Sequence, residues 1–382
     1  MKKSYFLLLL PLIFLQSNDF QQFIQQQKSS FERYKQTQTT DFETYKKAYE
    51  EGLKEYKNDI LQQWPQAELS TAHKWVQYDK NYATKKSVDF QNKTIKLEVI
   101  ANNEQEAREK LVESFNDLLK DDVQRAYSND QLEQKVQAKL PKTVLTPTIK
   151  TKQKIVADVI EKKEQEAYVE VIKKEPLVKK IYKENTIYTA NLKLPSTALL
   201  KKARLYTHDV KEYAQKNSVN EELIFAVIHS ESSFNPMARS HIPAYGLMQI
   251  VPKSAGLDVY NFLYKEKKIL SSTYLYDPSN NIKIGSTYLH MLYFNYLRHI
   301  KDETSRLYCS IAAYNTGAGN VARSFIGTIN IKEASKKINQ MSAQEVYKHL
   351  MRNLPYNETR KYLQRVNERR YVYLKLLNEE QL

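Results

Sequence analysis

The apolar residues of this chain change their spacing along its length, and this change limits the folds that are open to it. In residues 94–100 (TIKLEVI), Ile95, Leu97 and Val99 alternate with polar residues, which is the period of a half-buried strand. From about residue 197 to the C-terminus the apolar residues recur at helical offsets instead. We therefore predict an α+β fold, with a small sheet in the N-terminal part and a mainly α-helical C-terminal part.

The segment between residues 70 and 200 is predicted to hold the sheet. Its predicted strands are 87–90, 94–100, 155–160, 168–172 and 186–194. A helix is predicted over 103–119, with Asn102 as its N-cap. Residues 120–151 are polar and contain two prolines, so we predict a linker there.

The N-terminus has the pattern of an export signal. Lys2 and Lys3 precede an apolar run over residues 5–15, which is too short to cross a bilayer comfortably as a helix. A buried helix or an uncleaved anchor is the alternative. We expect a signal peptide (1–17), a helical lead-in with regularly spaced aromatic residues (18–66), an α+β domain (67–196) and a helical domain (197–382).

The charge of the chain favours an anionic partner. Lys and Arg number 59 against 44 Asp and Glu, a net charge of +15. Nucleic acid, a membrane surface and an acidic wall polymer all fit such a charge. Cys309 is the single cysteine, which excludes an intramolecular disulfide and a multi-Cys metal site. His229, His241 and His290 lack metal-ligand spacing, so we expect no metal and no other cofactor.

One carboxylate stands on an apolar helix face. A helix is predicted to start near Asn220, and Glu231 continues the inward stripe of Ile224, Val227 and Ile228. An Asn-Pro pair ends this helix soon afterwards, so desolvation and the negative end of the helix dipole should both raise the pKa of Glu231. Such a group suits a general acid, although a structural buried Glu is an equal alternative on this feature alone.

Four ordered motif blocks surround and follow this residue. They are 231–252 (with ESSFNP and AYGLMQIVP), 277–289 (DPSNNIKIGSTYL), 312–319 (AAYNTGAG) and 354–359 (LPYNET). Together they resemble the lytic transglycosylase domain of the soluble lytic transglycosylase and goose-type lysozyme superfamily, from about residue 205 to 373. Residues 75–101 resemble the N-terminal domain of a membrane-bound member of that family. The resemblance implies a lysozyme-like fold for residues 197–382.

The resemblance also implies a reaction. Lytic transglycosylases cleave the β-1,4 bond between N-acetylmuramic acid (MurNAc) and N-acetylglucosamine (GlcNAc) in peptidoglycan without water, and they leave a 1,6-anhydro-MurNAc end. Glu231 aligns with the family's single acid/base, and the substrate's N-acetyl group is expected to stabilise the intermediate. An ordinary glycosidase uses two carboxylates. Residues 232–253 contain no Asp or Glu, which fits a one-carboxylate site.

The resemblance also assigns further site residues, from their positions within the family's motifs. The resemblance implies substrate-binding roles for Ser240, Gln249, Tyr314, Asn315 and Glu358. Structural alternatives remain: Ser240 in a turn, Gln249 bonded only to backbone, Tyr314 as a core aromatic residue, and Glu358 at a helix N-terminus.

Three glycines and two departures from the family pattern affect the shape of the predicted cleft. Gly246, Gly317 and Gly319 are three of only seven glycines, and we interpret them as tight turns at the cleft. Pro243 stands where a Gly is common in the family, and Val251 replaces a frequent Met. We expect a changed loop and a changed sugar contact at these positions.

The leading hypothesis is therefore an exported, periplasmic peptidoglycan lytic transglycosylase of a Gram-negative-type cell. Its expected partner is the glycan strand of peptidoglycan, and nucleic acid is disfavoured because no nucleic-acid-binding motif is present. Peripheral membrane association stays open, without a lipid anchor, since no Cys follows the apolar leader. A lysozyme-type hydrolase and a non-catalytic wall-binding protein are the alternatives.

Overall fold

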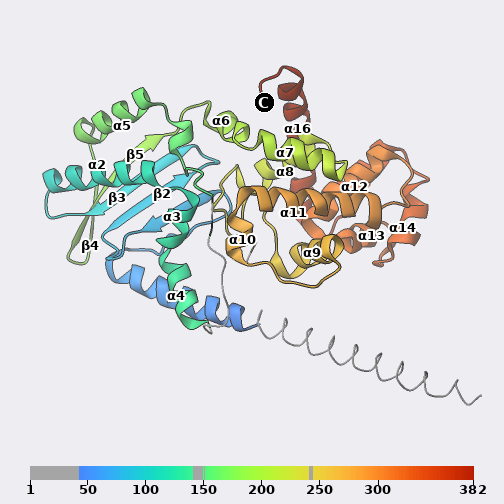
Figure 1. Cartoon of the computed structure of the whole chain (residues 1–382), viewed down its shortest axis with the longest axis horizontal. Coiled ribbons are helices and arrows are strands. Elements are labelled where there is room, and N and C mark those ends of the chain that lie inside the picture. The colour runs from blue at the N-terminus through green and yellow to red at the C-terminus, as the bar shows by residue number, and fades with distance from the viewer. Residues whose placement is uncertain (1–42, 141–148, 150, 241–243) are drawn as a thin grey trace, which may run out of the picture.

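The computed structural model of the chain describes residues 43–140, 149, 151–240 and 244–382. Figure 1 shows a part that contains a sheet beside a part built from helices. The predicted α+β class, with a small N-terminal sheet and a helical C-terminal part, is confirmed. The expected export signal lies outside the described residues. Within those residues, no helix combines the length and the apolar character that a membrane crossing needs.

The sheet has five strands, and every neighbouring pair is antiparallel. In the order β1-β2-β3-β5-β4, they are β1 (Lys74–Tyr78), β2 (Thr84–Asp89), β3 (Thr94–Ile100), β4 (Val178–Tyr182) and β5 (Asn185–Lys193). The alternation that predicted β3 is seen directly, since Ile95, Leu97 and Val99 are fully buried. The predicted hairpin is thus β2–β3, and the predicted strand at 186–194 is β5.

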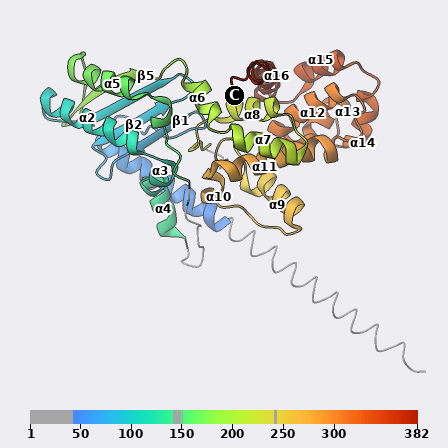
Figure 2. The ribbon, with the colours of Figure 1, turned by 45° about the horizontal axis from the view of Figure 1, so that its top comes forward.

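Helices cover both faces of this sheet (Figures 1 and 2). The helices of this part are α2 (Glu104–Lys120), α3 (Val123–Ser128), α4 (Gln131–Lys139), the short 3₁₀ helix η1 (Ala157–Val159) and α5 (Lys162–Lys174). One face joins a core with Leu111, Phe115 and Leu118 of α2. The other face packs with α4 and with a helix whose described residues are 43–63.

Several predictions for this part are wrong. The strands expected at 155–160 and 168–172 are instead η1 and the second half of α5, because Glu161 and Glu164 form a capping box that starts a helix. The linker expected over 120–151 contains α3 and α4. The N-cap of α2 is Asn103, which accepts from the Glu106 N–H, rather than Asn102.

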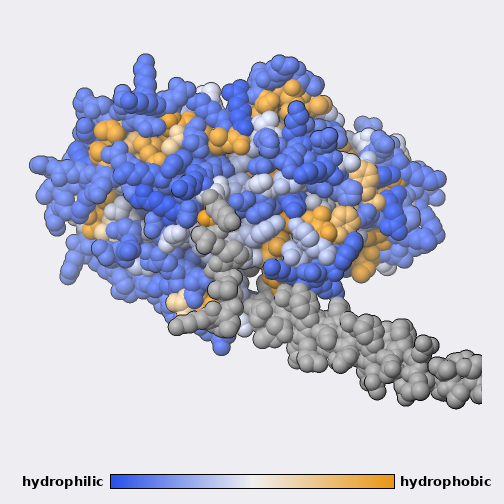
Figure 3. Space-filling view, viewed as in Figure 1, coloured by the Kyte–Doolittle hydropathy of each residue, from blue (hydrophilic) through white to orange (hydrophobic). Residues whose placement is uncertain are grey.

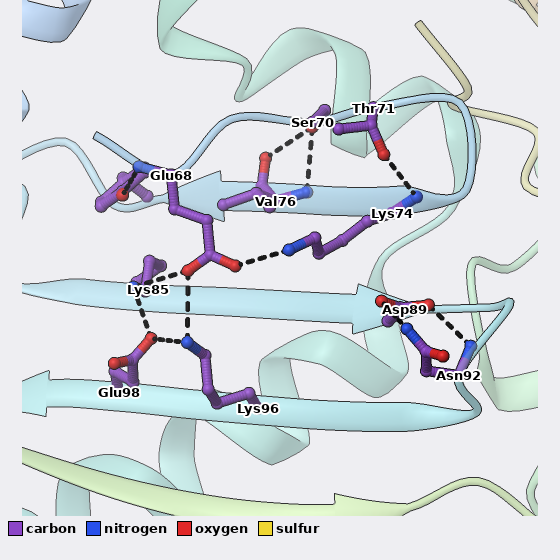
Figure 4. A network of polar contacts seen from close by, with 11 residues as sticks. Glu68, Ser70, Thr71, Lys74, Val76, Lys85, Asp89, Asn92, Lys96 and Glu98 are labelled. Carbon is purple, nitrogen blue, oxygen red and sulfur yellow. Dashed lines mark hydrogen bonds and ion pairs between the residues drawn. The ribbon is translucent and has the colours of Figure 1, made fainter. Parts of the chain in front are cut away.

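A network of ion pairs fixes the segment that leads into β1 (Figure 4). Glu68 contacts Lys85 at 2.9 Å and Lys74 at 3.0 Å, and Lys85 also pairs with Glu98. Burial raises the pKa of Glu68, but the charge of Lys85 and that of Lys96 outweigh it and lower this pKa to about 2. The loop at 70–73, which follows Glu68, is thereby held against the sheet.

The C-terminal part consists of helices throughout. They are α6 (Ala198–Arg204), α7 (Thr207–Asn217), α8 (Glu221–Ser232), the π-helix η2 (Pro252–Gly256), α9 (Leu257–Tyr264), α10 (Ser272–Tyr276), α11 (Pro278–His290), the π-helix η3 (Met291–Tyr296), α12 (Glu303–Thr316), α13 (Ala318–Ile326), α14 (Ile331–Ile338), α15 (Ala343–Asn353) and α16 (Asn357–Asn378). Helix α8 is buried on almost every side, and it packs against α7 and α16. In Figure 3 the apolar side chains form separate patches on a largely hydrophilic surface.

Local signals explain most of the helix boundaries. The Ser-x-x-Glu spacing of Ser342 and Glu345 predicts a capping box, which is present at the start of α15. Asp277 caps α11 by accepting from the Asn280 N–H. The same spacing at Ser218 and Glu221 predicts a second capping box, and this prediction is wrong. Ser218 ends α7 in a left-handed conformation (φ 53°), and Asn220 is the N-cap of α8.

Candidate active site

Glu231 lies in the last turn of α8, the most enclosed helix of the C-terminal part. The helix ends one residue later, and Ser233 and Phe234 both have left-handed backbone angles (φ 51° and 61°). Two successive non-glycine residues in this region turn the chain sharply away from the helix axis. The Glu231 carboxyl is therefore left at the C-terminal end of a buried helix, as its sequence predicted.

Burial dominates the electrostatics of this carboxyl. The pKa of Glu231 is raised to about 7, with desolvation as the largest cause and the charge of Glu358 as a smaller cause in the same direction. The Tyr362 hydroxyl and the Arg365 guanidinium oppose this rise. A carboxyl with such a pKa holds its proton for a substantial fraction of the time near neutral pH, which is what a general acid requires.

Helix α16 presents three polar side chains to this carboxyl. Glu358, Tyr362 and Arg365 are four and three residues apart, which places them on one face of the helix. Arg365 contacts Glu358 at 3.3 Å, and Glu358 itself is 66% exposed. The Tyr362 hydroxyl is buried and has no hydrogen-bond partner of ordinary geometry among the described residues, so the Glu231 carboxyl is the group with which it interacts.

Tyr314 joins this carboxyl to the neighbouring loop. Its hydroxyl donates to the Met248 carbonyl at 2.9 Å, and its ring lies 5.5 Å from that of Tyr288. The charge of Glu231 raises the pKa of Tyr314, after burial as the larger cause, so the two groups are close enough to interact. Tyr314 is therefore placed both beside Glu231 and against the loop.

A cavity of about 290 Å³ opens between η2 and the end of α12. Its lining residues are Gln249, Ile250, Val251, Ser254, Ala255, Tyr288, Tyr314, Asn315, Thr316 and Gly317. The structure thus brings three predicted substrate-binding residues to one cavity, namely Gln249, Tyr314 and Asn315. The lining of this cavity contains no His, Cys, Asp or Glu, which are the usual metal ligands.

The loop that supplies Gln249 requires a glycine. Gly246 has a φ of 74°, and a Cβ there would overlap the Leu275 carbonyl oxygen and the Asn281 side chain. Asn281 anchors the loop through two hydrogen bonds. Its side chain accepts from the Met248 N–H at 2.8 Å and donates to the Tyr245 carbonyl at 2.8 Å. Gln249 has a φ of 49°, and its side-chain amide donates to the Gly246 carbonyl at 3.1 Å.

The other predicted site residues have different positions. Ser240 exchanges two hydrogen bonds of 3.2 Å with the backbone of Ala244, and it is not among the residues that line this cavity. Asn315 accepts from the Thr359 hydroxyl at 2.7 Å, which ties α12 to the start of α16. Glu358 lies in the first turn of α16, as the structural alternative predicted, while its charge reaches Glu231. Pro243 lies outside the described residues.

Tyr362 and Arg365 were missed as site residues. Tyr362 follows the last motif block at 354–359 and has no role assigned from the sequence, and Arg365 has none either. Their spacing from Glu358 on one helix was the available signal. The described residues contain one group that could hold a metal ion, His208, Asp209 and Glu212, at the exposed start of α7. Cys309 is buried and its pKa is raised by that burial, as expected of a structural thiol.

Comparison with known families agrees with this geometry. Residues 209–341 match the transglycosylase SLT domain, the catalytic-type domain predicted from the motif blocks. Residues 40–196 match the N-terminal domain of membrane-bound lytic murein transglycosylase C. The two models match consecutive parts of the chain, so the resemblance to the lytic transglycosylases inferred from the sequence is confirmed.

Individual relatives give the same result over half of the chain. The chain is 44% identical over 188 residues to membrane-bound lytic murein transglycosylase C of Salmonella arizonae, and 43% identical over 187 residues to that of Klebsiella pneumoniae. Each match covers 49% of this chain and 51% of the relative, so the chain spans about half the length of the curated relatives it matches. The 70 kDa soluble lytic transglycosylase of Escherichia coli is 25% identical over 47% of this chain and 26% of its own, with a TM-score of 0.36.

Proposed function

We propose that this protein is a peptidoglycan lytic transglycosylase that cleaves the MurNAc–GlcNAc β-1,4 bond without water. The observation that carries the proposal is Glu231, a carboxyl whose pKa is raised to about 7 at the end of a buried helix inside the SLT domain. The relatives named lytic murein transglycosylase support the same substrate class.

The first step breaks the glycosidic bond. Protonated Glu231 donates its proton to the bridging oxygen, so the C1–O4 bond can break and the GlcNAc side leaves as an alcohol. The acetamido group of MurNAc stabilises the positive charge that develops at C1. Because burial keeps a substantial fraction of Glu231 protonated near neutral pH, the acid is available before the substrate binds.

The second step closes the anhydro ring. Glu231, now a carboxylate, takes the proton from the O6 hydroxyl of MurNAc, and O6 forms a bond to C1. The Tyr362 hydroxyl and the Arg365 guanidinium favour the carboxylate form and so support its role as a base. Tyr314, Gln249 and Asn315 line the neighbouring cavity and are proposed to hold the sugar there.

A lysozyme-type hydrolase is the second candidate within the same superfamily. An ordinary glycosidase needs a second carboxylate that flanks the bond. Glu358 is the carboxylate nearest to this role, but it is mostly exposed and paired with Arg365. That arrangement favours a supporting electrostatic role for Glu358 and a one-carboxylate reaction.

Digestion of purified sacculi tests the proposal. The full chain is expected to release muropeptides with 1,6-anhydro ends, detected by mass spectrometry, and Glu231→Gln is expected to release none. Reducing ends would instead identify a hydrolase. Wild-type protein that binds sacculi without cleaving them would support the non-catalytic alternative.

The proposed setting is the periplasm, reached through the leader at residues 1–17. The proposed organisation is a helical lead-in (18–66), an α+β domain (67–196) and the catalytic domain (197–382). The relatives are named membrane-bound, which supports an association with the cell envelope. Fractionation of cells that express the tagged full chain, with the leader intact or deleted, tests both the export and the association.

A further inference from the structure

A buried ion cluster joins the N-terminal domain to the loop of the candidate site. Arg239 is 5% exposed and directly precedes Ser240. Its guanidinium contacts the Glu133 carboxylate at 3.0 Å and the Asp130 carboxylate at 3.3 Å. Asp130 is the N-cap of α4 and Glu133 lies in the first turn of that helix, so both acids come from the N-terminal domain.

Arg239, Tyr245 and Ile250 are joined by backbone bridges, and we call these bridged residues the frame that carries Gln249. Arg239 forms an antiparallel bridge with Tyr245, and Tyr245 forms a second one with Ile250. The Tyr245–Ile250 bridge has two hydrogen bonds of 3.1 Å, and Ile250 is the neighbour of Gln249. A displacement of Arg239 would therefore be transmitted through Tyr245 to the cavity lining.

Further contacts from the N-terminal domain reach the same frame. The hydroxyls of Tyr45 and Tyr245 are 2.8 Å apart. The Thr71 carbonyl accepts from the Arg239 N–H at 3.4 Å, and the Ala72 carbonyl accepts from the Asn235 side chain at 3.1 Å. These groups hold the frame from the N-terminal domain, and Asn281 holds it from the SLT domain.

We propose that Arg239 is a positioning residue through which the N-terminal domain sets the substrate-binding loop of the SLT domain. The inference rests on the proposed function and deepens it. A guanidinium that is enclosed with two carboxylates has a strong preference for one position, because leaving either charge unpaired in the interior is costly. The loop thus has its Gln249 side chain and its Met248 carbonyl fixed relative to Tyr314 only while the two domains are docked.

The test compares Arg239→Gln and Arg239→Lys with the parent in the full chain. Hydrogen exchange at residues 244–250 and binding of a peptide-free GlcNAc tetramer are measured in a Glu231→Gln background, and kcat/KM on sacculi is measured with Glu231 present. A misplacement of about 1 Å can cost ~10²-fold in rate, so we expect a loss of this order for Arg239→Gln, faster exchange in the loop, and partial recovery in Arg239→Lys.

The control is Asp121→Asn, which disturbs a buried ion pair with Lys86 inside the N-terminal domain. It is expected to lower stability without changing exchange at 244–250 or kcat/KM per folded molecule. If Arg239→Gln does not fold, Tyr45→Phe removes the 2.8 Å hydroxyl pair with no change of volume, and faster loop exchange and weaker tetramer binding are expected from it. Unchanged exchange and affinity in a folded Arg239→Gln or Tyr45→Phe variant, or equal losses in Asp121→Asn, would overturn the inference. Failure of the proposed function would show separately, as absent cleavage by the parent.

Discussion

At the scale of single residues, the proposed chemistry depends on a carboxyl that the fold holds in an unfavourable place. Ionised Glu231 is poorly solvated at the end of α8, and the interactions with Tyr362 and Arg365 compensate only in part. The same burial that makes Glu231 a proton donor near neutral pH therefore costs folding stability whenever the proton is lost.

This cost predicts that Glu231→Gln is more stable than the parent in alkaline solution. The pKa of Glu231 is about 7 in the folded protein, above the value of about 4.5 for the free side chain. The contribution of protonated Glu231 to the free energy of unfolding is therefore complete below about pH 4.5 and is lost as the pH rises through about 7. A difference of this size corresponds to roughly 2–3 kcal/mol once partial exposure is allowed for. Gln cannot ionise and avoids the loss.

Urea unfolding at about pH 5 and pH 8 measures this difference. Glu231→Gln should gain stability relative to the parent between the two pH values, while the exposed Glu109→Gln in α2 should not. An equal difference at both pH values would mean that Glu231 ionises as an ordinary surface carboxyl.

The Tyr362 hydroxyl predicts a shift in the pH profile of activity. It lowers the pKa of Glu231, so Tyr362→Phe should raise that pKa and move the alkaline limb of kcat/KM to higher pH. Tyr373→Phe is the matched control, because Tyr373 is buried in the same helix but its hydroxyl contacts His229 at 3.0 Å. An unmoved limb in Tyr362→Phe, or the same shift in both variants, would contradict the assigned interaction.

At the scale of elements, the loop at 244–250 depends on a glycine for two separate reasons. Gly246 has a positive φ, and any Cβ would overlap Leu275 and Asn281. Gly327 also has a positive φ (76°), at the end of α13, but no atom lies within 4 Å of the place where its Cβ would stand. The two positions separate backbone strain from steric overlap.

Gly327→Ala is therefore expected to cost about 1–2 kcal/mol, which is the usual penalty for a left-handed L-residue. Gly246→Ala should cost clearly more and should also lower activity, because the loop must shift to relieve the overlap. Denaturant unfolding gives both costs, and cleavage of sacculi gives the loss of function. Equal costs at the two positions would show that the overlap is relieved without consequence.

The sequence predicted elements well where one local signal dominated. The alternation in β3 and the capping box of α15 were sufficient, because each encodes a local geometry. The segment of α5 was misread, since its Lys- and Glu-rich first turns resemble a solvated connection unless the capping pair is recognised. Helices α3 and α4 were missed because their core contacts come from distant segments, such as the helix at 43–63.

The candidate site was predictable to a similar extent. Glu231 could be found because a carboxylate interrupts an apolar stripe within a specific motif. The contact of Arg239 with Asp130 and Glu133 joins segments more than 100 residues apart, and no periodicity encodes such a pair. Ser240 stays a predicted substrate-binding residue, and the structure shows its hydrogen bonds with the backbone of Ala244.

At the scale of the whole molecule, the sheet-containing part and the helical part meet beside the residue proposed to do the chemistry. The Glu68 network holds the loop at 70–73 to the sheet (Figure 4). This loop contacts the chain immediately after α8. His73 is hydrogen-bonded to Ser233 at 3.1 Å, two residues beyond Glu231. The sheet-containing N-terminal part is therefore part of the support for the site.

The net positive charge of the whole chain predicts salt-sensitive binding to the cell wall. The chain carries a net charge of +15, and peptide-substituted glycan is acidic, so the attraction should weaken as the Debye length falls from about 30 Å at 0.01 M salt to about 8 Å at 0.15 M. We expect roughly tenfold weaker binding of full-length Glu231→Gln to sacculi over this range, measured by co-sedimentation.

The exposed edge strand β4 offers a matched pair of variants for this measurement. Lys179 and Lys180 are exposed on it, as is Ile181, which is 71% exposed. Replacing both lysines by Gln removes two charges and should weaken binding at low salt while leaving the high-salt value nearly unchanged. Ile181→Thr changes the same strand without changing its charge and should bind as the parent does. Binding that is indifferent to salt, or an equal loss in both variants, would mean that the basic surface has no part in holding the polymer and that contacts in the cavity supply the affinity.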